Sequence, residues 1–206
     1  MITKKEVVDF PFNTRNFDRI KRLRYPRHRR FLKNHDALRG RILVLQPYNG
    51  HDAQKVEDDI MRILKSHKVK HPRSRVKGII SSIHGNYQKE KTEHAYLGYM
   101  MDIHKIMMCY NLGAVICIFP TLNIKESHSG ATRAELYVGA MQHSIDGHLF
   151  VVVMEDGYPH PHRDYVETCI SKYAPDVPIF KNIKEAILAV ANLIDRDSLP
   201  HREEGD

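Results

Sequence analysis

The segment LGAVICIFP (112–120) decides the fold, because its side chains are apolar on both faces of an extended chain. A strand of this kind is typical of the centre of a parallel sheet that helices cover on both sides. The segment HLFVVVME (148–155) has the same character, and a helical pattern at about 131–144 separates the two. Because parallel strands need a crossover connection, the two segments predict neighbouring parallel strands joined by a helix.

The same alternation of strands and helices extends outward from this pair in both directions. Further strands are predicted at 41–46, 76–83 and 177–180, and further helices after Asp52 and at about 91–110, 163–173 and 183–194. The sequence therefore predicts an α/β fold with a doubly wound, open, parallel five-stranded sheet, similar to flavodoxin-like and Rossmann-like folds.

The composition is that of an ordinary globular protein. The chain has 206 residues, of which 42% are apolar and 28% charged, and this length suffices for a continuous core without disulfides or a structural metal. No stretch reaches the roughly 18–20 apolar residues of a membrane span. The three cysteines, Cys109, Cys117 and Cys169, are widely spaced among apolar neighbours, which favours a reducing compartment. We therefore expect a cytoplasmic protein that does not contact a membrane.

The positive charge is concentrated at the start of the chain. Residues 1–40 carry 12 Lys or Arg and 4 Asp or Glu, whereas the rest of the chain carries 20 and 21. The densest part is FDRIKRLRYPRHRR (17–30), a cluster that could contact nucleic acid or another anion, or remain a solvated arm. We predict a basic N-terminal arm (1–40), one α/β domain (41–196) and a polar tail (197–206).

Several common enzyme motifs are absent from the sequence. No GxGxxG or GxxxxGK[ST] motif follows a predicted strand, which disfavours the usual dinucleotide and P-loop sites. A metal at His160 and His162, with Asp164 nearby, is a weak alternative, because two histidines in a proline-rich loop are usually solvated. We therefore expect no metal and no organic cofactor.

The loops that follow the predicted strands are the first place to look for a site, because ligands of open parallel sheets bind outside the carboxyl ends of the strands. The most informative loop leads into SHSGATRAELYVGA (127–140), where Ser129 and Gly130 lie at a helix start and Glu135 follows one turn later. Free N–H groups at a helix start can bind an anion. The alternative interpretation makes Ser129 a simple N-cap and Glu135 a surface residue.

Three segments then occur in a recognisable order. RILVLQPYNG (41–50) is a strand that ends in a proline turn. MMDIHKIMMCYNLGAVICIFP (100–120) is a helix with an acidic residue that leads into an apolar strand, and AELYVGAMQHSIDGHLFVVV (134–153) is a helix with a glutamate that leads into another. Together they resemble the nucleoside 2-deoxyribosyltransferase superfamily, which includes the deoxynucleoside monophosphate N-glycosidases, over about residues 41–155.

This resemblance implies a role for each candidate residue. Glu135 is expected to be the nucleophile that attacks C1′, and Asp102 to orient the sugar or protonate the departing base. Tyr48 is expected to hold the nucleophile or to stack on the base. The serine six residues before the nucleophile, Ser129, is similar to the one that contacts the 5′-phosphate in the monophosphate-hydrolysing branch, so the resemblance favours a nucleotide over a nucleoside. The full set of expected substrate-binding residues is Gln46, Pro47, Asn49, Gly50, Ser129 and Gly130.

Three functions remain open at the level of the sequence. The resemblance favours an enzyme that cleaves or transfers the N-glycosidic bond of a nucleotide, and it implies a homo-oligomer. The first alternative is a nucleotide-binding module without catalysis on the same sheet. The second is a basic protein associated with nucleic acid, in which the cluster at 17–30 makes the contact.

Overall fold

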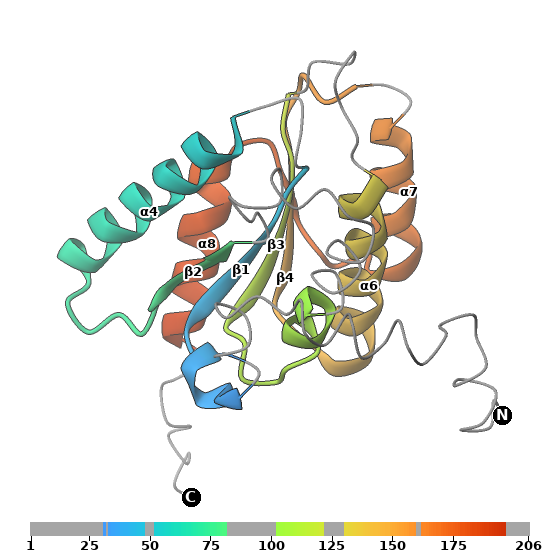
Figure 1. The fold of residues 1–206 in the computed structure, drawn as a ribbon. Helices are drawn as coiled ribbons and strands as arrows, with labels where there is room; N and C mark the ends of the chain where they lie inside the picture. The colour runs from blue at the N-terminus through green and yellow to red at the C-terminus, as the bar shows by residue number, and fades with distance from the viewer. Residues whose placement is uncertain are drawn as a thin grey trace, which may run out of the picture.

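The computed structural model describes residue 31 and residues 33–47, 52–81, 102–121, 130–159 and 162–196. A helical stretch at 102–107 adds to the main elements. Figure 1 shows these elements, which in chain order are η1 (His35–Leu38), β1 (Arg41–Leu45), α4 (Ala53–Lys70), β2 (Gly78–Ser81), β3 (Ala114–Phe119), α6 (Gly130–Asp146), β4 (Phe150–Met154), α7 (His162–Tyr173), β5 (Ile179–Phe180) and α8 (Ile183–Arg196).

The strands form one parallel sheet with the order β2-β1-β3-β4-β5. Cys117 of β3 lies opposite Leu45 of β1 on one side and opposite Val152 of β4 on the other. Every residue of β3 is buried, as expected for a central strand that is apolar on both faces. The predicted α/β fold, with its doubly wound, open, five-stranded parallel sheet, is therefore confirmed.

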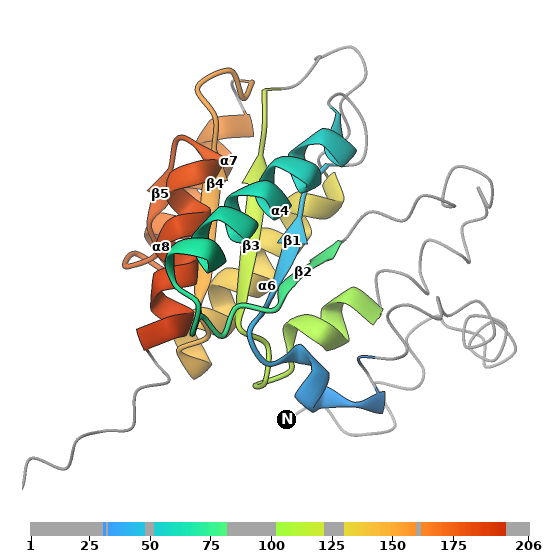
Figure 2. The ribbon, with the colours of Figure 1, turned by 90° about the vertical axis from the view of Figure 1, so that its left-hand side faces the viewer.

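Helices cover both faces of the sheet. Figures 1 and 2 show α4 and α8 on one face, and α6, α7 and residues 102–107 on the other. The strand side chains alternate accordingly, so that Leu43 and Leu45 of β1 pack on the α6 side, whereas Ile42 and Val44 pack on the α4 side. Within the described ranges, no helix is both long and apolar enough to cross a membrane.

Two element ends differ from the sequence prediction because of local turns. The helix predicted to reach residue 110 ends at 107 in its described part, where the Cys109 N–H donates to the Ile106 carbonyl at 3.1 Å in a tighter turn. The strand predicted at 177–180 shortens to Ile179–Phe180. The reason is that the Val177 N–H donates to the Ala174 carbonyl at 3.0 Å and so belongs to the turn after α7.

The packed part of the chain begins before the predicted domain start at residue 41. Leu38 of η1 is completely buried, and Phe31 is buried in the same core cluster on the α6 side of the sheet. The Arg41 guanidinium lies 5.2 Å from the centre of the Phe31 ring, and its Nε donates to the Ala37 carbonyl at 3.0 Å. The predicted boundary at residue 40 therefore falls within a packed region. The basic cluster at 17–30 and the tail at 197–206 lie outside the described residues.

Candidate active site

The strand order creates a switch point between β1 and β3. From β1 the chain crosses by α4 to β2 at one edge, whereas from β3 it crosses by α6 toward β4 on the other side (Figure 1). The two connections leave on opposite faces, so the loops after β1 and β3 separate at their carboxyl ends. This is where ligands bind in open α/β sheets. Gln46 and Pro47 follow β1 there, and Pro120 and Thr121 follow β3.

Glu135 lies in α6 and faces the inner side of β3. Its side chain is 3% exposed, and the next residue, Leu136, belongs to the core cluster that also contains Cys117 of β3. The Cys117 thiol donates to the Thr132 carbonyl at 3.6 Å, in the turn of α6 that precedes Glu135. Burial, followed by the nearby Glu135 carboxylate, raises the pKa of Cys117. The helix therefore carries an acidic group into the apolar layer beside the central strand.

The environment of Glu135 changes its ionisation. Burial raises the pKa of this carboxyl from 4.5 to about 8, because the charged form loses its hydration. Among the described residues, none makes an ion pair or hydrogen bond with the carboxyl that would offset this loss. At pH 7 a group with this pKa is only about one-tenth ionised. Carboxyls with such shifted pKa values are concentrated at functional sites.

A glycine brings α6 close enough to the sheet to bury Glu135. Gly139 lies one turn after Glu135, and a Cβ at this position would lie 2.5 Å from a ring carbon of Phe150 in β4. Phe150 is itself buried in the core, so its ring has little space in which to move. A side chain at position 139 would therefore push this part of α6 away from the sheet.

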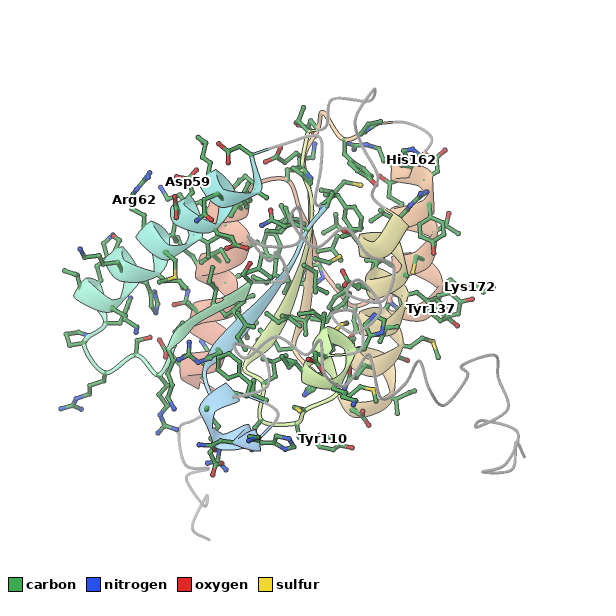
Figure 3. The ribbon with its side chains drawn as sticks, in the orientation of Figure 1. Asp59, Arg62, Tyr110, Tyr137, His162 and Lys172 are labelled. Carbon is green, nitrogen blue, oxygen red and sulfur yellow. The ribbon has the colours of Figure 1, made fainter. Side chains whose placement is uncertain are left out.

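The outer side of the same helix confirms this orientation. Tyr137, two residues after Glu135, is 41% exposed and lies at the surface near Lys172 of α7 (Figure 3). Its ring meets the Tyr173 ring edge to face, with the centroids 5.0 Å apart. Residues two apart on a helix point in different directions, so an outward Tyr137 is consistent with an inward Glu135.

Asp102, the second acidic candidate, is fully buried at the start of the helical stretch 102–107. The following residues Ile103, Ile106 and Met107 belong to the same core cluster as Leu136 of α6. The structure therefore brings Asp102 and Glu135 to one face of the sheet. Their chemical roles remain predictions.

Gln46 makes its contacts on the opposite face. Its side-chain amide donates to the Ala53 carbonyl and to Glu57 Oε1 of α4, both at 3.3 Å, and Ser81 of β2 donates to the same Glu57 oxygen. These contacts fix the start of α4 to the ends of β1 and β2. Pro47 is buried next to Gln46. A substrate contact by either residue remains a prediction.

The other predicted site residues are described in part or not at all. Gly130 is the first residue of α6, in agreement with a helix that begins near residue 131. Tyr48, Asn49, Gly50 and Ser129 lie outside the described residues. The proposed phosphate contact of Ser129 and the proposed role of Tyr48 therefore remain predictions.

Hydrogen bonds hold the loops after β3 and β4 together. The Thr121 N–H donates to Glu155 Oε2 at 2.8 Å, and Arg163 of α7 donates to the Glu155 and Asp156 carbonyls at 2.9 and 3.1 Å. The loop after β4 also contributes Tyr158, which is buried with its ring 5.1 Å from that of Phe119.

Tyr158 was not among the residues selected from the sequence. Its position in a loop that follows a predicted strand could have identified it, because ligands of open parallel sheets bind near such loops. Arg163 stabilises this loop, because its guanidinium donates hydrogen bonds to two backbone carbonyls of the loop.

In the described part of the chain, no group of three or more His, Cys, Asp and Glu residues is arranged to hold a metal ion. His162, one of the two histidines considered as a ligand, lies with Nδ1 3.1 Å from Nη1 of Arg133. No protein-family model matches the sequence, and neither a curated protein nor a solved structure matches the chain.

Proposed function

We propose that the protein cleaves the N-glycosidic bond of a nucleotide, with Glu135 as the group that attacks the sugar. The observation that carries this proposal is a carboxyl buried beside the central strand, in the helix that follows the carboxyl end of β3, with a pKa of about 8. The sequence resemblance to the nucleoside 2-deoxyribosyltransferase superfamily supports the same residue in the same role. Asp102, on the same face of the sheet, is the proposed partner that orients the sugar or supplies a proton.

The proposed reaction has two steps. Glu135 attacks C1′, the bond between C1′ and the base nitrogen breaks, and the base leaves with the bonding electrons and receives a proton. Water then attacks C1′ of the sugar ester and regenerates the carboxylate, as in retaining glycosidases. The burial of Glu135 suits such a step, because a poorly hydrated carboxylate is a stronger nucleophile than a solvated one.

The raised pKa makes the role of Glu135 testable by pH. A nucleophile must be ionised, so the rate should increase as the pH rises toward about 8 and level off above it. A general acid must be protonated, and its rate would decrease over the same range. A rate that decreases through pH 8 would therefore contradict the nucleophile and assign Glu135 to proton donation.

The decisive experiment measures release of free base by chromatography from a panel of deoxynucleoside monophosphates and the matching nucleosides. Glu135→Gln should lower the rate by several orders of magnitude, because the amide lacks the nucleophilic oxygen. Glu167→Gln, an exposed position on α7, is the matched control and should retain the wild-type rate. A 2-fluoro-2-deoxy analogue should add the mass of its sugar to the wild-type peptide that contains Glu135.

Two results would contradict the proposal. Near-normal base release by Glu135→Gln would exclude this nucleophile. Tight nucleotide binding by the wild type, without base release at any pH, would support the non-catalytic binding module instead. A thermal-shift measurement with the same nucleotides detects that binding.

A further inference from the structure

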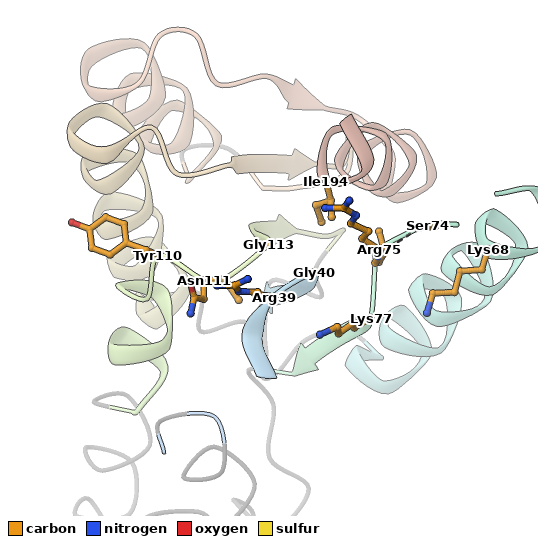
Figure 4. Close-up of a pocket in the computed structure, with 12 residues that line it drawn as sticks. Arg39, Gly40, Lys68, Ser74, Arg75, Lys77, Tyr110, Asn111, Gly113 and Ile194 are labelled. Atoms are coloured by element: carbon orange, nitrogen blue, oxygen red, sulfur yellow. Dashed lines mark hydrogen bonds between the residues drawn. The ribbon is translucent and has the colours of Figure 1, made fainter. Parts of the chain in front are cut away.

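A pocket lies at the amino edge of the sheet, and Glu135 is not among its lining residues. It has a volume of about 640 Å³ and is formed where the chain enters β1, β2 and β3 (Figure 4). The lining residues come from the segments before these strands, from the end of α4 and from the end of α8. None of the candidate residues at the carboxyl edge lines this pocket.

Four cationic side chains line the pocket. Arg39 precedes β1, Lys68 lies near the end of α4, and Arg75 and Lys77 precede β2. Arg39 makes an exposed ion pair with Asp36 at 3.3 Å. Within the described part of the chain, the side chains of Lys68, Arg75 and Lys77 form no ion pair. The pocket therefore presents positive charge that the described residues do not neutralise.

A second carboxylate beside the pocket, that of Asp195, accepts hydrogen bonds from other donors. Asp195 follows the lining residue Ile194. Its carboxylate accepts hydrogen bonds from the Arg75 N–H at 2.7 Å and from Ser74 Oγ at 3.1 Å. It also pairs with His67 Nε2 at 2.9 Å. These contacts bind Asp195 to the backbone before β2. They leave the guanidinium of Arg75 available to a ligand.

The backbone around the pocket is closely packed, so the cations start from fixed positions. Gly40 has a φ of +70°, and a Cβ there would lie 2.1 Å from the Arg75 carbonyl oxygen. The Lys77 N–H donates to the Gly40 carbonyl at 2.6 Å, and the Gly113 N–H donates to the Arg41 carbonyl at 3.0 Å. Only glycine allows this combination of positive φ and close approach, which joins the segments that carry Arg39, Arg75 and Lys77.

An aromatic ring and an amide complete the lining. Tyr110 is 77% exposed and lies across the pocket from Lys68 (Figure 4). Asn111 is beside it, near Arg39. The Tyr110 ring lies at the border of the pocket, 6.0 Å from the His148 ring. Exposed aromatic rings that flank a cationic surface are typical of proteins that bind single-stranded nucleic acid, because bases stack on the ring while phosphates contact the cations.

We propose that this pocket binds the phosphate backbone of single-stranded nucleic acid, with Tyr110 stacking on a base. Lys68, Arg75 and Lys77 supply the phosphate contacts. The Asn111 amide nitrogen donates to Asp36 Oδ1 at 3.5 Å, so its carbonyl oxygen is the group that can accept from a base or a sugar. The charge of the sequence agrees with such a partner, since the excess of basic residues lies in 1–40, the part that leads into Arg39. This proposal does not depend on the proposed activity, because the two sites share no residue.

The test uses the full chain and a fluorescent 20-nucleotide oligo-dT in fluorescence polarisation across a salt series. The triple variant Lys68→Gln, Arg75→Gln, Lys77→Gln should lose three phosphate contacts. Each contact contributes a salt exponent of about 0.7 for a single strand, so the exponent should fall by about 2 and the affinity at 0.1 M salt by about 100-fold. The matched control, Lys172→Gln, Lys181→Gln, Lys184→Gln, has the same charge change at distant exposed positions and should lose far less.

A second variant tests the stacking. Tyr110→Ala should weaken the single strand by roughly tenfold and a duplex of equal length much less, because duplex bases are not free to stack. Equal losses for both would overturn the single-strand assignment.

Three further results would overturn the proposal. The first is that the wild-type chain does not bind the oligonucleotide at 50 mM salt. The second is that the triple variant keeps the wild-type affinity and salt exponent. The third is that micromolar inorganic phosphate or nucleoside monophosphate displaces the strand. The last would identify a small-anion site. Circular dichroism of each variant checks that the fold is retained.

Discussion

The two candidate sites differ in the environment of their ionisable side chains, which are buried in one and exposed in the other. On the α6 face, Glu135 and Asp102 are buried in the apolar layer between the sheet and its helices. At the amino edge, Arg39 and Lys77 extend from short segments before the strands into an open pocket. Helix α6 begins after the carboxyl end of β3 and inserts its side chains inward, whereas the amino edge is formed by chain segments that remain at the surface.

This difference separates two ways of using an ionisable residue. Burial changes the chemistry of a single carboxyl, which suits bond cleavage within a small substrate. An open group of cations retains its charge and gains binding energy by adding contacts along a polyanion.

The pH dependence of stability should originate on the α6 face. The folded state raises the pKa of Glu135 from 4.5 to about 8, so between these values the folded chain holds a proton that the unfolded chain has lost. The free energy of unfolding should therefore be highest at low pH with respect to this group, and fall by up to roughly 4–5 kcal/mol as the pH rises through 8.

Glu135→Gln removes this titration. The difference in stability between the wild type and the variant therefore reports the ionisation of Glu135 alone. The variant should match the wild type near pH 3.5 and exceed it in stability at pH 9, as measured by urea unfolding at both values. A stability difference that is the same at both pH values would mean that Glu135 is ionised in the folded protein. That result would remove the main contrast between the two candidate sites.

The amino edge should depend on its apolar residues for stability. Leu38, the residue before Arg39, is fully buried within the sequence predicted to be a basic arm. Leu38→Ala should cost about 2–5 kcal/mol, because it leaves a cavity in the core. Leu193→Ala on α8, where the side chain is 37% exposed, is the control and should cost clearly less in the same urea unfolding experiment. Equal costs would mean that Leu38 contributes no more to stability than a partly exposed side chain.

Gly139→Ala tests whether close packing of α6 is what buries Glu135. The added methyl group would overlap the Phe150 ring, and overpacking of this kind costs about 1–3 kcal/mol. The double variant Gly139→Ala, Phe150→Leu should recover part of that loss, because the smaller side chain frees space. Thermal unfolding of the two single variants and the double variant gives the coupling between the two residues. Purely additive losses would show that the ring is not the obstacle.

The fold could be predicted from the sequence because the central strands are apolar on both faces, a pattern typical of a parallel sheet that helices cover on both sides. The segment 112–120 can be stable only where both faces are covered, and the helical patterns around it supply that cover. The ends of elements depended instead on single backbone contacts. Val177 was predicted to start a strand, but its N–H is used by the turn after α7.

The two sites differed in how far the sequence could reveal them. Glu135 was selected by its position in a motif, yet its burial depends on the contact between Gly139 and Phe150, which no local pattern encodes. The cations of the amino edge come from separate segments, each of which is typical of solvated surface. Their convergence follows from the strand order and from the close approach of Gly40 to Arg75.

The smallest predicted effect concerns Asp195, the acidic residue at the border of the cationic pocket. Burial opposes its ionisation, but hydrogen bonds from His67, the Arg75 N–H and Ser74 outweigh burial and lower the pKa of Asp195 below its usual value. The residue is therefore negative at neutral pH and should repel a phosphate backbone in the pocket. A unit charge about 10 Å away in water contributes on the order of 0.4 kcal/mol, which corresponds to about a twofold change in affinity.

Asp195→Asn keeps the shape of the side chain and one of its acceptor oxygens, so it should tighten binding of the oligo-dT probe about twofold at low salt. The gain should vanish at high salt, where the Debye length is only about 3 Å at 1 M. Glu167→Gln, which makes the same charge change on α7, should leave the affinity unchanged within error. Weaker binding by Asp195→Asn in a folded protein would mean that Asp195 positions Arg75 for the phosphate, and that the amino edge needs its acid as well as its cations.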